Sequence, residues 1–201
     1  MKLNYIVAAS ALALSAGAAH AAVIDFTGSG TGAGSGVSLS CDAFGILNYG
    51  GCSVTYNNSG LGVNGSPDTQ PGQIDGSPIF SSERLTLSFG QDMVWNNITF
   101  GRWDSNDDAR LTAGDGTTYQ YTGNGNSVDL GGYVSNQLTI AAYGNISNDC
   151  VFFGCFLLAG DDSFTVASID VSAVPLPASL PLVLGGLGML GWTSRKRKKA
   201  A

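Results

Sequence analysis

Leu85-Thr86-Leu87-Ser88-Phe89 is the stretch that decides the fold. Apolar and polar residues alternate strictly along it, so an extended strand would have one apolar and one polar face. The same alternation returns at 164–171, which reads Phe-Thr-Val-Ala-Ser-Ile-Asp-Val. Both stretches predict half-buried β-strands, because an amphipathic helix would repeat its apolar residues every three to four positions.

Further strand-like segments lie around these two stretches. They are 23–26, 37–41, 52–56, 94–100, 110–112, 117–122, 127–130, 137–143 and the continuously apolar 151–158. About ten short strands without helical periodicity predict an all-β domain, an antiparallel β-sandwich of jelly-roll-like form. We expect its first and last strands to lie side by side. The glycine-rich segments 28–36 and 57–82 predict loops, the second one unusually long.

The charge of the predicted domain, residues 22–173, is strongly acidic. It holds all 15 acidic residues of the chain, and its only basic residues are Arg84, Arg102 and Arg110, so its net charge is 3 − 15 = −12. Binding to nucleic acid depends on Lys and Arg side chains that neutralise phosphates. Nucleic-acid partners are therefore not expected.

The four cysteines are even in number and fall into two local pairs. Four cysteines allow three pairings. We expect Cys41–Cys52 and Cys150–Cys155, because each pair brackets a glycine-containing turn. A metal or redox site would need a further ligand type that the sequence lacks near them, so structural disulfides are favoured.

Both ends of the chain carry targeting features. Residues 1–21 combine Lys2, an apolar run and the small-residue ending Ala19-His20-Ala21, which predicts a signal peptide cleaved before Ala22. Near the other end, 179–194 is uncharged and mostly apolar, and it is just long enough for one short transmembrane helix. The basic cluster that follows would stay on the cytoplasmic side. Its members are Arg195, Lys196, Arg197, Lys198 and Lys199.

The order of the C-terminal parts resembles the PEP-CTERM sorting signal in its VPLPA variant. Val174, Pro175, Leu176, Pro177 and Ala178 match that motif letter for letter, and the apolar segment and the basic tail at 195–201 follow. The resemblance implies an exosortase-type transpeptidase as partner. It also implies a membrane-anchored precursor, then delivery to the cell surface or extracellular matrix of a Gram-negative bacterium. An ordinary C-terminal anchor would have the same topology.

Residue types narrow the chemistry. The only histidine, His20, lies in the predicted signal peptide, so histidine-based triads and HExxH zinc sites are not expected, and we assign no catalytic residue. Glycoside hydrolysis needs only two carboxyl groups. Glu83 with Asp75, Asp104 or Asp107 is therefore the alternative to a non-enzymatic protein.

The best candidate for a metal site is the acidic segment 104–108, followed by Asp115. Its oxygen-bearing side chains have the spacing of a calcium loop, with Asp104, Asn106, Asp108 and Asp115 as expected ligands. Ala109 stands where an EF-hand loop has glycine, so no EF-hand is predicted. A solvated acidic turn is the other interpretation.

Two tryptophans are candidate carbohydrate contacts. Trp95 and Trp103 are an even number of residues apart, so a regular strand would present both on one face. Packing in the core is the alternative fate. Together these features predict an exported, non-enzymatic surface or matrix protein that binds exopolysaccharide with the help of calcium.

Overall fold

A computed structural model of the protein describes residues 21–28, 36–44, 51–66, 68, 70–77, 81–143 and 162–174. All of them fall within one compact unit, His20–Val174. In these ranges no helix has the length and apolar character that a membrane span requires. Several predictions lie outside the described residues: residues 1–20 of the signal peptide, the strand 151–158, Cys150 and Cys155, 175–178 of the sorting motif, the transmembrane helix 179–194 and the tail 195–201.

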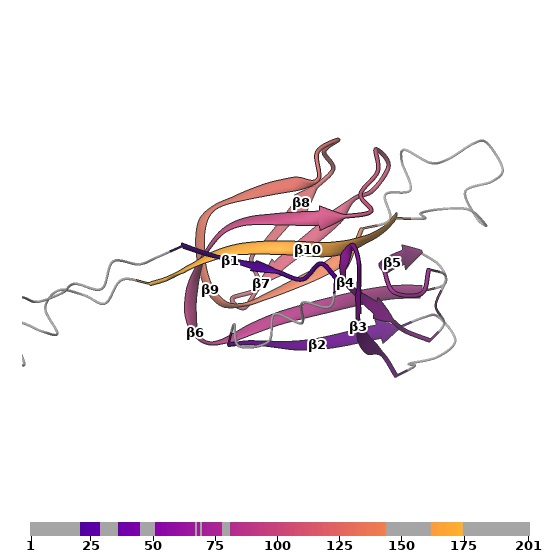
Figure 1. Cartoon of the computed structure of the whole chain (residues 1–201), viewed down its shortest axis with the longest axis horizontal. Coiled ribbons are helices and arrows are strands. Elements are labelled where there is room, and N and C mark those ends of the chain that lie inside the picture. Colours follow the sequence, from indigo (N-terminus) through magenta and orange to yellow (C-terminus); the bar gives the residue numbers. More distant parts are fainter. Residues whose placement is uncertain are drawn as a thin grey trace, which may run out of the picture. The chain divides into compact units, whose positions relative to one another are not determined.

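The described residues form ten strands. They are β1 (Ala21–Asp25), β2 (Val37–Phe44), β3 (Ser53–Asn57), β4 (Gly60–Asn64), β5 (Ile74–Ser77), β6 (Ser81–Gly101), β7 (Ala109–Ala113), β8 (Thr118–Tyr121), β9 (Ser127–Ala142) and β10 (Asp162–Ala173). They belong to one curled sheet in the order β3-β4-β10-β5-β6-β9-β7-β8, with β1 beside β10 and β2 beside β6 (Figure 1). Every pairing is antiparallel. The prediction of an antiparallel all-β fold is confirmed.

Two long strands, β6 and β9, pair with each other along most of their length, and the other neighbour of β6 changes along the way. Up to Phe89, β6 pairs with β2 and with the second part of β9; from Met93 it pairs with β10 and with the first part of β9. The register between β6 and β9 shifts between Ser88 and Met93 and again between Trp95 and Asn97. Such irregularities bend and twist a strand, which explains why one continuous strand was predicted as two.

The inner face of the curled sheet is the apolar core. Leu85 and Leu87 of β6 lie opposite Ile140 and Leu138 of β9, and all four side chains are buried. The strand predicted from strict alternation is therefore confirmed, and its polar members face away from the core. Burial of such side chains contributes about 1.5–3 kcal/mol each, which makes this face the main source of stability.

The first and last strands of the described sheet pair with each other. β1 runs antiparallel to β10, from Ala21 opposite Ser172 to Asp25 opposite Ser168 (Figure 1). This confirms the expectation that they lie side by side. β10 ends at Ala173, directly before the predicted sorting motif.

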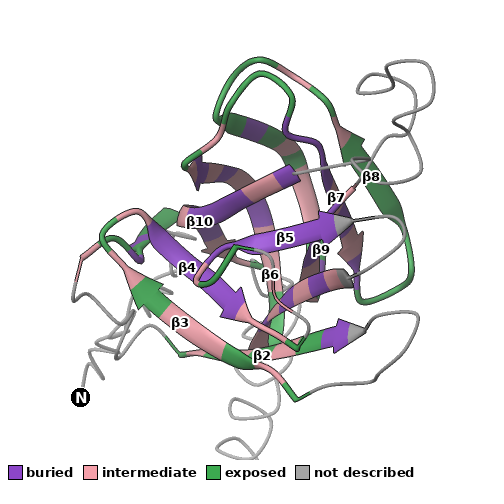
Figure 2. Cartoon of the chain, turned by 90° about the vertical axis from the view of Figure 1, so that its right-hand side faces the viewer, coloured by how far each residue is buried: buried purple, intermediate pink, exposed green. Residues whose placement is uncertain are grey.

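The prediction of one loop across 57–82 is wrong, because β4 and β5 lie within it. Figure 2 shows both strands as largely buried, and Leu61 and Val63 of β4 are fully buried. A Cβ atom at Gly62 would lie 2.0 Å from the carbonyl oxygen of Gly72. Only glycine permits backbones to approach so closely. The glycines that suggested a loop are here a packing requirement.

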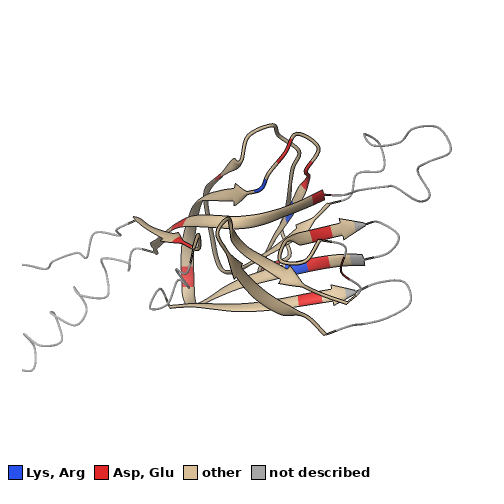
Figure 3. Cartoon of the chain, turned by 45° about the vertical axis from the view of Figure 1, so that its right-hand side comes forward, with Lys and Arg blue, Asp and Glu red and all other residues tan. Residues whose placement is uncertain are grey.

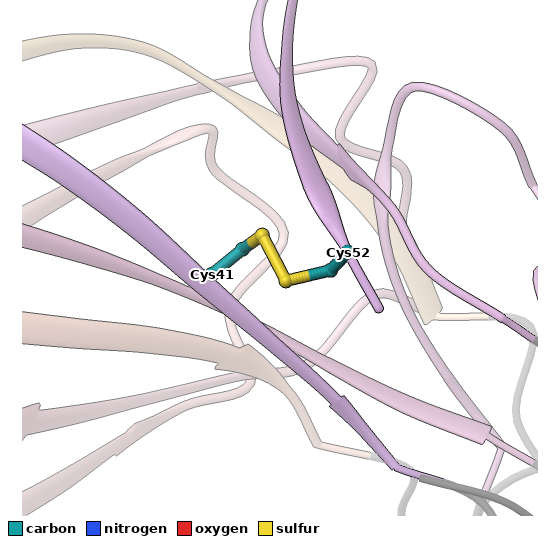
Figure 4. The surroundings of a disulfide bond; sticks show 2 residues. All are labelled: Cys41 and Cys52. Atoms are coloured by element: carbon teal, nitrogen blue, oxygen red, sulfur yellow. A yellow bond between two sulfur atoms is a disulfide. The ribbon is translucent and has the colours of Figure 1, made fainter. Parts of the chain in front are cut away.

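A disulfide joins Cys41 of β2 to Cys52, which directly precedes β3 (Figure 4). The two Cα atoms are 6.0 Å apart, an ordinary separation for a disulfide. This predicted pairing is confirmed. The bond ties β3, at one end of the strand order, to β2 and through it to β6.

Candidate functional site

Three carboxyl groups converge where β5 and β6 meet. They belong to Asp75 of β5, to Glu83 of β6 and to Asp68 in the connection between β4 and β5. One oxygen of each lies within 4.8 Å of one oxygen of each other group. Figure 3 shows acidic positions in red on neighbouring strands of the sheet, β5 and β6 among them. We call Asp68, Asp75 and Glu83 the buried carboxyl cluster.

The alternation of β6 explains why Glu83 points inward. It precedes Leu85 by two residues and shares the buried face of the strand, and its side chain is 0 % exposed. Asp75 is 1 % exposed, because β5 lies between β10 and β6 in the sheet. Asp68 is half-buried. Sequence reasoning named Glu83 and Asp75 as one of three alternative pairs and did not consider Asp68.

Backbone amides donate hydrogen bonds into the cluster, among them those of Gly65 and Gln70 to Asp68. The Asp75 amide donates to Glu83 Oε2 over 3.2 Å, and the Gln70 amide donates to Asp75 Oδ2 over 2.8 Å. Glu83 Oε1 and Asp68 Oδ1 are shut off from solvent and accept no hydrogen bond from the described part of the chain. A buried oxygen without a donor costs free energy, so this arrangement calls for a proton or a cation.

Gly65 forms one wall of the cluster. A Cβ atom at this position would lie 2.5 Å from Glu83 Oε1 and 2.7 Å from the Cβ atom of Ala43, which is the partner of Glu83 on β2. Any larger residue would push the glutamate oxygen away. Glycine therefore leaves just enough room for the carboxyl group.

Burial dominates the electrostatics of the cluster. Burial, the hydrogen bond from the protonated carboxyl to Asp75 and the charges of Asp75 and Asp68 together raise the pKa of Glu83 to about 9, against a lowering by the Asp75 amide. Burial and the Asp75 charge also raise the pKa of Asp68. Without a cation, the cluster holds a proton at neutral pH.

The predicted calcium ligands do not come together. Asp108 directly precedes β7, while Asp115 lies in the turn after it, and the five-residue strand between them spans roughly 16 Å. Asp104, Asp108 and Asp115 accordingly form no cluster of metal-ligating oxygens among the described residues. A calcium loop assumes a segment that folds back on itself, whereas the strand β7 between Asp108 and Asp115 is extended.

Each part of that acidic segment instead shapes a turn. Asp107 is buried and accepts hydrogen bonds from the Asp104 amide over 2.6 Å and from the Ser163 amide of β10 over 2.9 Å. Asp115 is exposed and accepts from the amide and hydroxyl of Thr117 and from the Tyr133 hydroxyl. These hydrogen bonds lower the pKa of Asp115. The alternative interpretation, a solvated acidic turn, fits the exposed Asp104 and Asp115 but not the buried Asp107 and Asp108.

The two tryptophans do not form an exposed platform. Trp95 is 0 % exposed and its Nε1 donates to the Ser135 carbonyl over 2.8 Å. Trp103 is half-buried, stacks on Phe100 with ring centroids 4.7 Å apart and donates to the Gly123 carbonyl. The prediction of a shared face is wrong for a physical reason: β6 is irregular after Trp95 and ends before Trp103.

A cavity of about 150 Å³ lies between β8, β9 and the core. Its lining includes Trp95, Leu138, Asp129 and the rings of Tyr119 and Tyr133. An apolar cavity of about this volume can hold one six-membered ring. Tyr119 is 49 % exposed, so one aromatic ring of the lining is open to a large ligand.

One of the alternative catalytic pairs, Glu83 with Asp75, is brought together by the fold, but both side chains are buried. Glu83 lies beside Asp75, whereas Asp104 and Asp107 belong to the turn described above. A glycosidase needs two carboxyl groups that a sugar can reach. Both Glu83 and Asp75 are shielded from solvent, so a polysaccharide has no direct access to them.

Comparisons with known proteins return no match: no family model fits the chain, and no curated protein is significantly similar to it. The residues of the tail and the geometry described above are therefore the basis for any functional assignment.

Proposed function

We propose that the chain is an exported, non-enzymatic protein that is sorted to the cell surface or extracellular matrix of a Gram-negative bacterium. The observation that carries this proposal is the order of parts after the domain. The motif Val174 to Ala178, the uncharged segment 179–194 and the basic tail 195–201 follow one another without interruption. An exosortase-type transpeptidase is the proposed partner.

Two structural observations support this proposal. The Cys41–Cys52 disulfide is typical of proteins folded in an oxidising compartment. Because β10 ends at Ala173 and Val174 is exposed, the proposed motif begins where the sheet ends, and an enzyme could reach it without unfolding a strand. In this proposal the curled sheet is a jelly-roll-like sandwich, and 179–194 is its single transmembrane helix.

Intact mass spectrometry tests the proposal. The protein is recovered from the outer fraction of the native cell without reduction, and its mass is compared with the sequence. We expect a mass that begins at Ala22 and ends near Val174 to Ala178. A mass that retains residues 195–201 would mean a plain membrane anchor, and the exosortase partner would have to be abandoned.

Binding of an extracellular polysaccharide is the proposed role at the surface. The cavity beside Tyr119 and Tyr133 supports it, since aromatic rings offer apolar faces to a sugar ring. In this proposal the sugar contacts are these two tyrosines and not Trp95 and Trp103. We expect the full chain to bind at least one matrix polysaccharide, and Tyr119→Ala to weaken that binding about tenfold. No binding to any polysaccharide of a broad panel would overturn this role.

A polysaccharide hydrolase that uses Glu83 and Asp75 is the second candidate. The proximity of the two carboxyl groups favours it, and their burial weighs against it. Glu83→Gln should abolish turnover if this candidate is correct. Absence of turnover by the wild-type chain on the same panel would remove it.

A further inference from the structure

We propose that the buried carboxyl cluster of Asp68, Asp75 and Glu83 binds one calcium ion, which joins β5, β6 and the connection between β4 and β5. The three carboxyl groups come from separate parts of the chain and converge on one point. This site shares no residue with the acidic segment that the sequence pattern suggested. The inference does not depend on the proposed sorting, because it concerns the folded domain alone.

The spacing of the oxygens fits a calcium ion. Calcium binds oxygen ligands at about 2.3–2.6 Å, so two ligands on opposite sides of the ion lie up to about 5 Å apart. One oxygen from each of Asp68, Asp75 and Glu83 lies within 4.8 Å of the others. Three oxygens at this spacing lie within about 2.8 Å (4.8/√3) of a common point, so a small movement brings all three to one ion.

The unsatisfied oxygens point to a ligand in the cluster. Backbone amides occupy Glu83 Oε2 and Asp75 Oδ2. Glu83 Oε1, on a fully buried side chain, and Asp68 Oδ1 are left without a donor from the described residues. A cation between them would satisfy both oxygens and offset the repulsion among the three carboxyl groups.

Gly65 accounts for the room that the Glu83 carboxyl group takes up. Because any Cβ at this position would lie 2.5 Å from Glu83 Oε1, only glycine leaves room for the glutamate carboxyl group at this point of the cluster.

The donor set favours calcium over other metals. All three ligands are carboxylates, whereas zinc and copper sites in proteins generally use histidine or cysteine. Magnesium demands a near-ideal octahedron at about 2.0–2.1 Å and usually keeps several waters, so sites built wholly from protein ligands are less common for it. Backbone carbonyls and water would complete the coordination, as is common for calcium.

The strength of binding follows from the environment. Extracellular calcium sites typically have Kd values of about 0.1–1 mM. The predicted domain has a net charge of −12 (3 − 15), which raises the local concentration of cations. We therefore expect a Kd in this range.

Thermal unfolding of the full chain in detergent, first freed of metal by a chelator, tests the proposal. At about 10 mM calcium the Tm should rise by roughly 3–10 °C, and by less with magnesium. Asp68→Asn and Glu83→Gln should each remove most of the calcium-induced rise. Asp104→Asn, which removes an exposed carboxylate from the acidic turn, is the matched control and should keep it.

The outcomes separate this site from its alternatives. Absence of a calcium-induced rise in the wild-type chain overturns the proposal. An equal rise in all three variants also overturns it, because the ion then binds elsewhere. If Glu83→Gln does not fold, Asp68→Asn decides, since Asp68 is only half-buried. The mass measurement of the tail is unaffected by any of these results.

Discussion

The domain contains two acidic regions that differ in almost every physical respect. The acidic segment 104–108 with Asp115 is dense in sequence, yet its carboxyl groups end up in separate turns. The buried carboxyl cluster is spread over Asp68, Asp75 and Glu83, yet its oxygens lie within 4.8 Å of one another. Residues that are close in the sequence can lie far apart when the chain between them is extended. Pairing between strands, in contrast, brings together residues that are far apart in the sequence.

The difference extends to their hydrogen bonds. Asp115 is exposed and accepts three hydrogen bonds, so its charge is well solvated. Glu83 is fully buried and accepts one from an amide. A carboxylate in the first situation is stable by itself, while one in the second needs a proton or a cation. The following predictions test this contrast, from the largest expected effect to the smallest.

The two regions should respond to pH in opposite directions. The pKa of Glu83 is about 9 in the folded state and 4.5 in the unfolded chain. Protonated Glu83 therefore contributes full stability below about pH 4.5, and this contribution is lost as the pH rises towards 9. The charged groups that face Glu83 are Asp75 and Asp68. In metal-free protein the free energy of unfolding should fall by at most about 1.4 kcal/mol per pH unit.

Chemical denaturation at several pH values in chelator measures this decline. Glu83→Gln should flatten it, because glutamine does not titrate. The lowered pKa of Asp115 has the opposite effect, since its contribution is present above pH 3.8 and is lost as the pH falls. A wild-type stability that does not decline between pH 5 and 9 would contradict the buried position of Glu83.

Loss of the Cys41–Cys52 disulfide should destabilise the domain near the buried carboxyl cluster. Cys41 lies on β2 two residues before Ala43, the strand partner of Glu83. Opening a bridge that spans 11 residues should lower the free energy of unfolding by about 3 kcal/mol in the chain-entropy model. Urea denaturation of the Cys41→Ser, Cys52→Ser double variant measures this. An unchanged midpoint would show that the bond does not support the sheet.

Filling the space at Gly65 should disturb the cluster directly. In Gly65→Val the new atoms would collide with Glu83 Oε1 and with Ala43, at a cost of about 2–3 kcal/mol. Gly90→Ala is the matched control, because a Cβ there meets nothing within 4 Å. Its stability should stay within about 0.5 kcal/mol of wild type. Equal effects of both variants in urea denaturation would argue against a tightly filled cluster.

Within the acidic turn, the buried Asp107 should matter more than the exposed Asp104. Asp107→Ala leaves the Asp104 and Ser163 amides without their acceptor and should cost about 1–3 kcal/mol. Asp104→Ala, at an exposed position, should cost about 0.5 kcal/mol or less. Comparison of the two midpoints in urea checks this order. The reverse order would mean that the turn is held by Asp104.

Alternation made the strand predictions succeed where one face is apolar and the other polar. The strands around Leu85 and Phe164 belong to this kind. The pairing of the first and last strands is expected from the fold class and not from alternation. Alternation failed for β4, whose burial pattern is continuous and whose glycines face neighbouring backbone. It also failed at Trp95, because the register shift in β6 cannot be read from the residues themselves.

The sequence by itself determined the all-β class, the local Cys41–Cys52 disulfide and the absence of a histidine from the described domain. These properties depend on residue types and on residues close together in the sequence, so a short stretch of sequence is enough to predict them. Only the tertiary structure decided which acidic residues meet. The connection after β4 and the pairing of β5 with β6 bring Asp68 and Asp75 to Glu83. Contacts of this kind arise from the order of strands in the sheet, to which no single stretch of sequence corresponds.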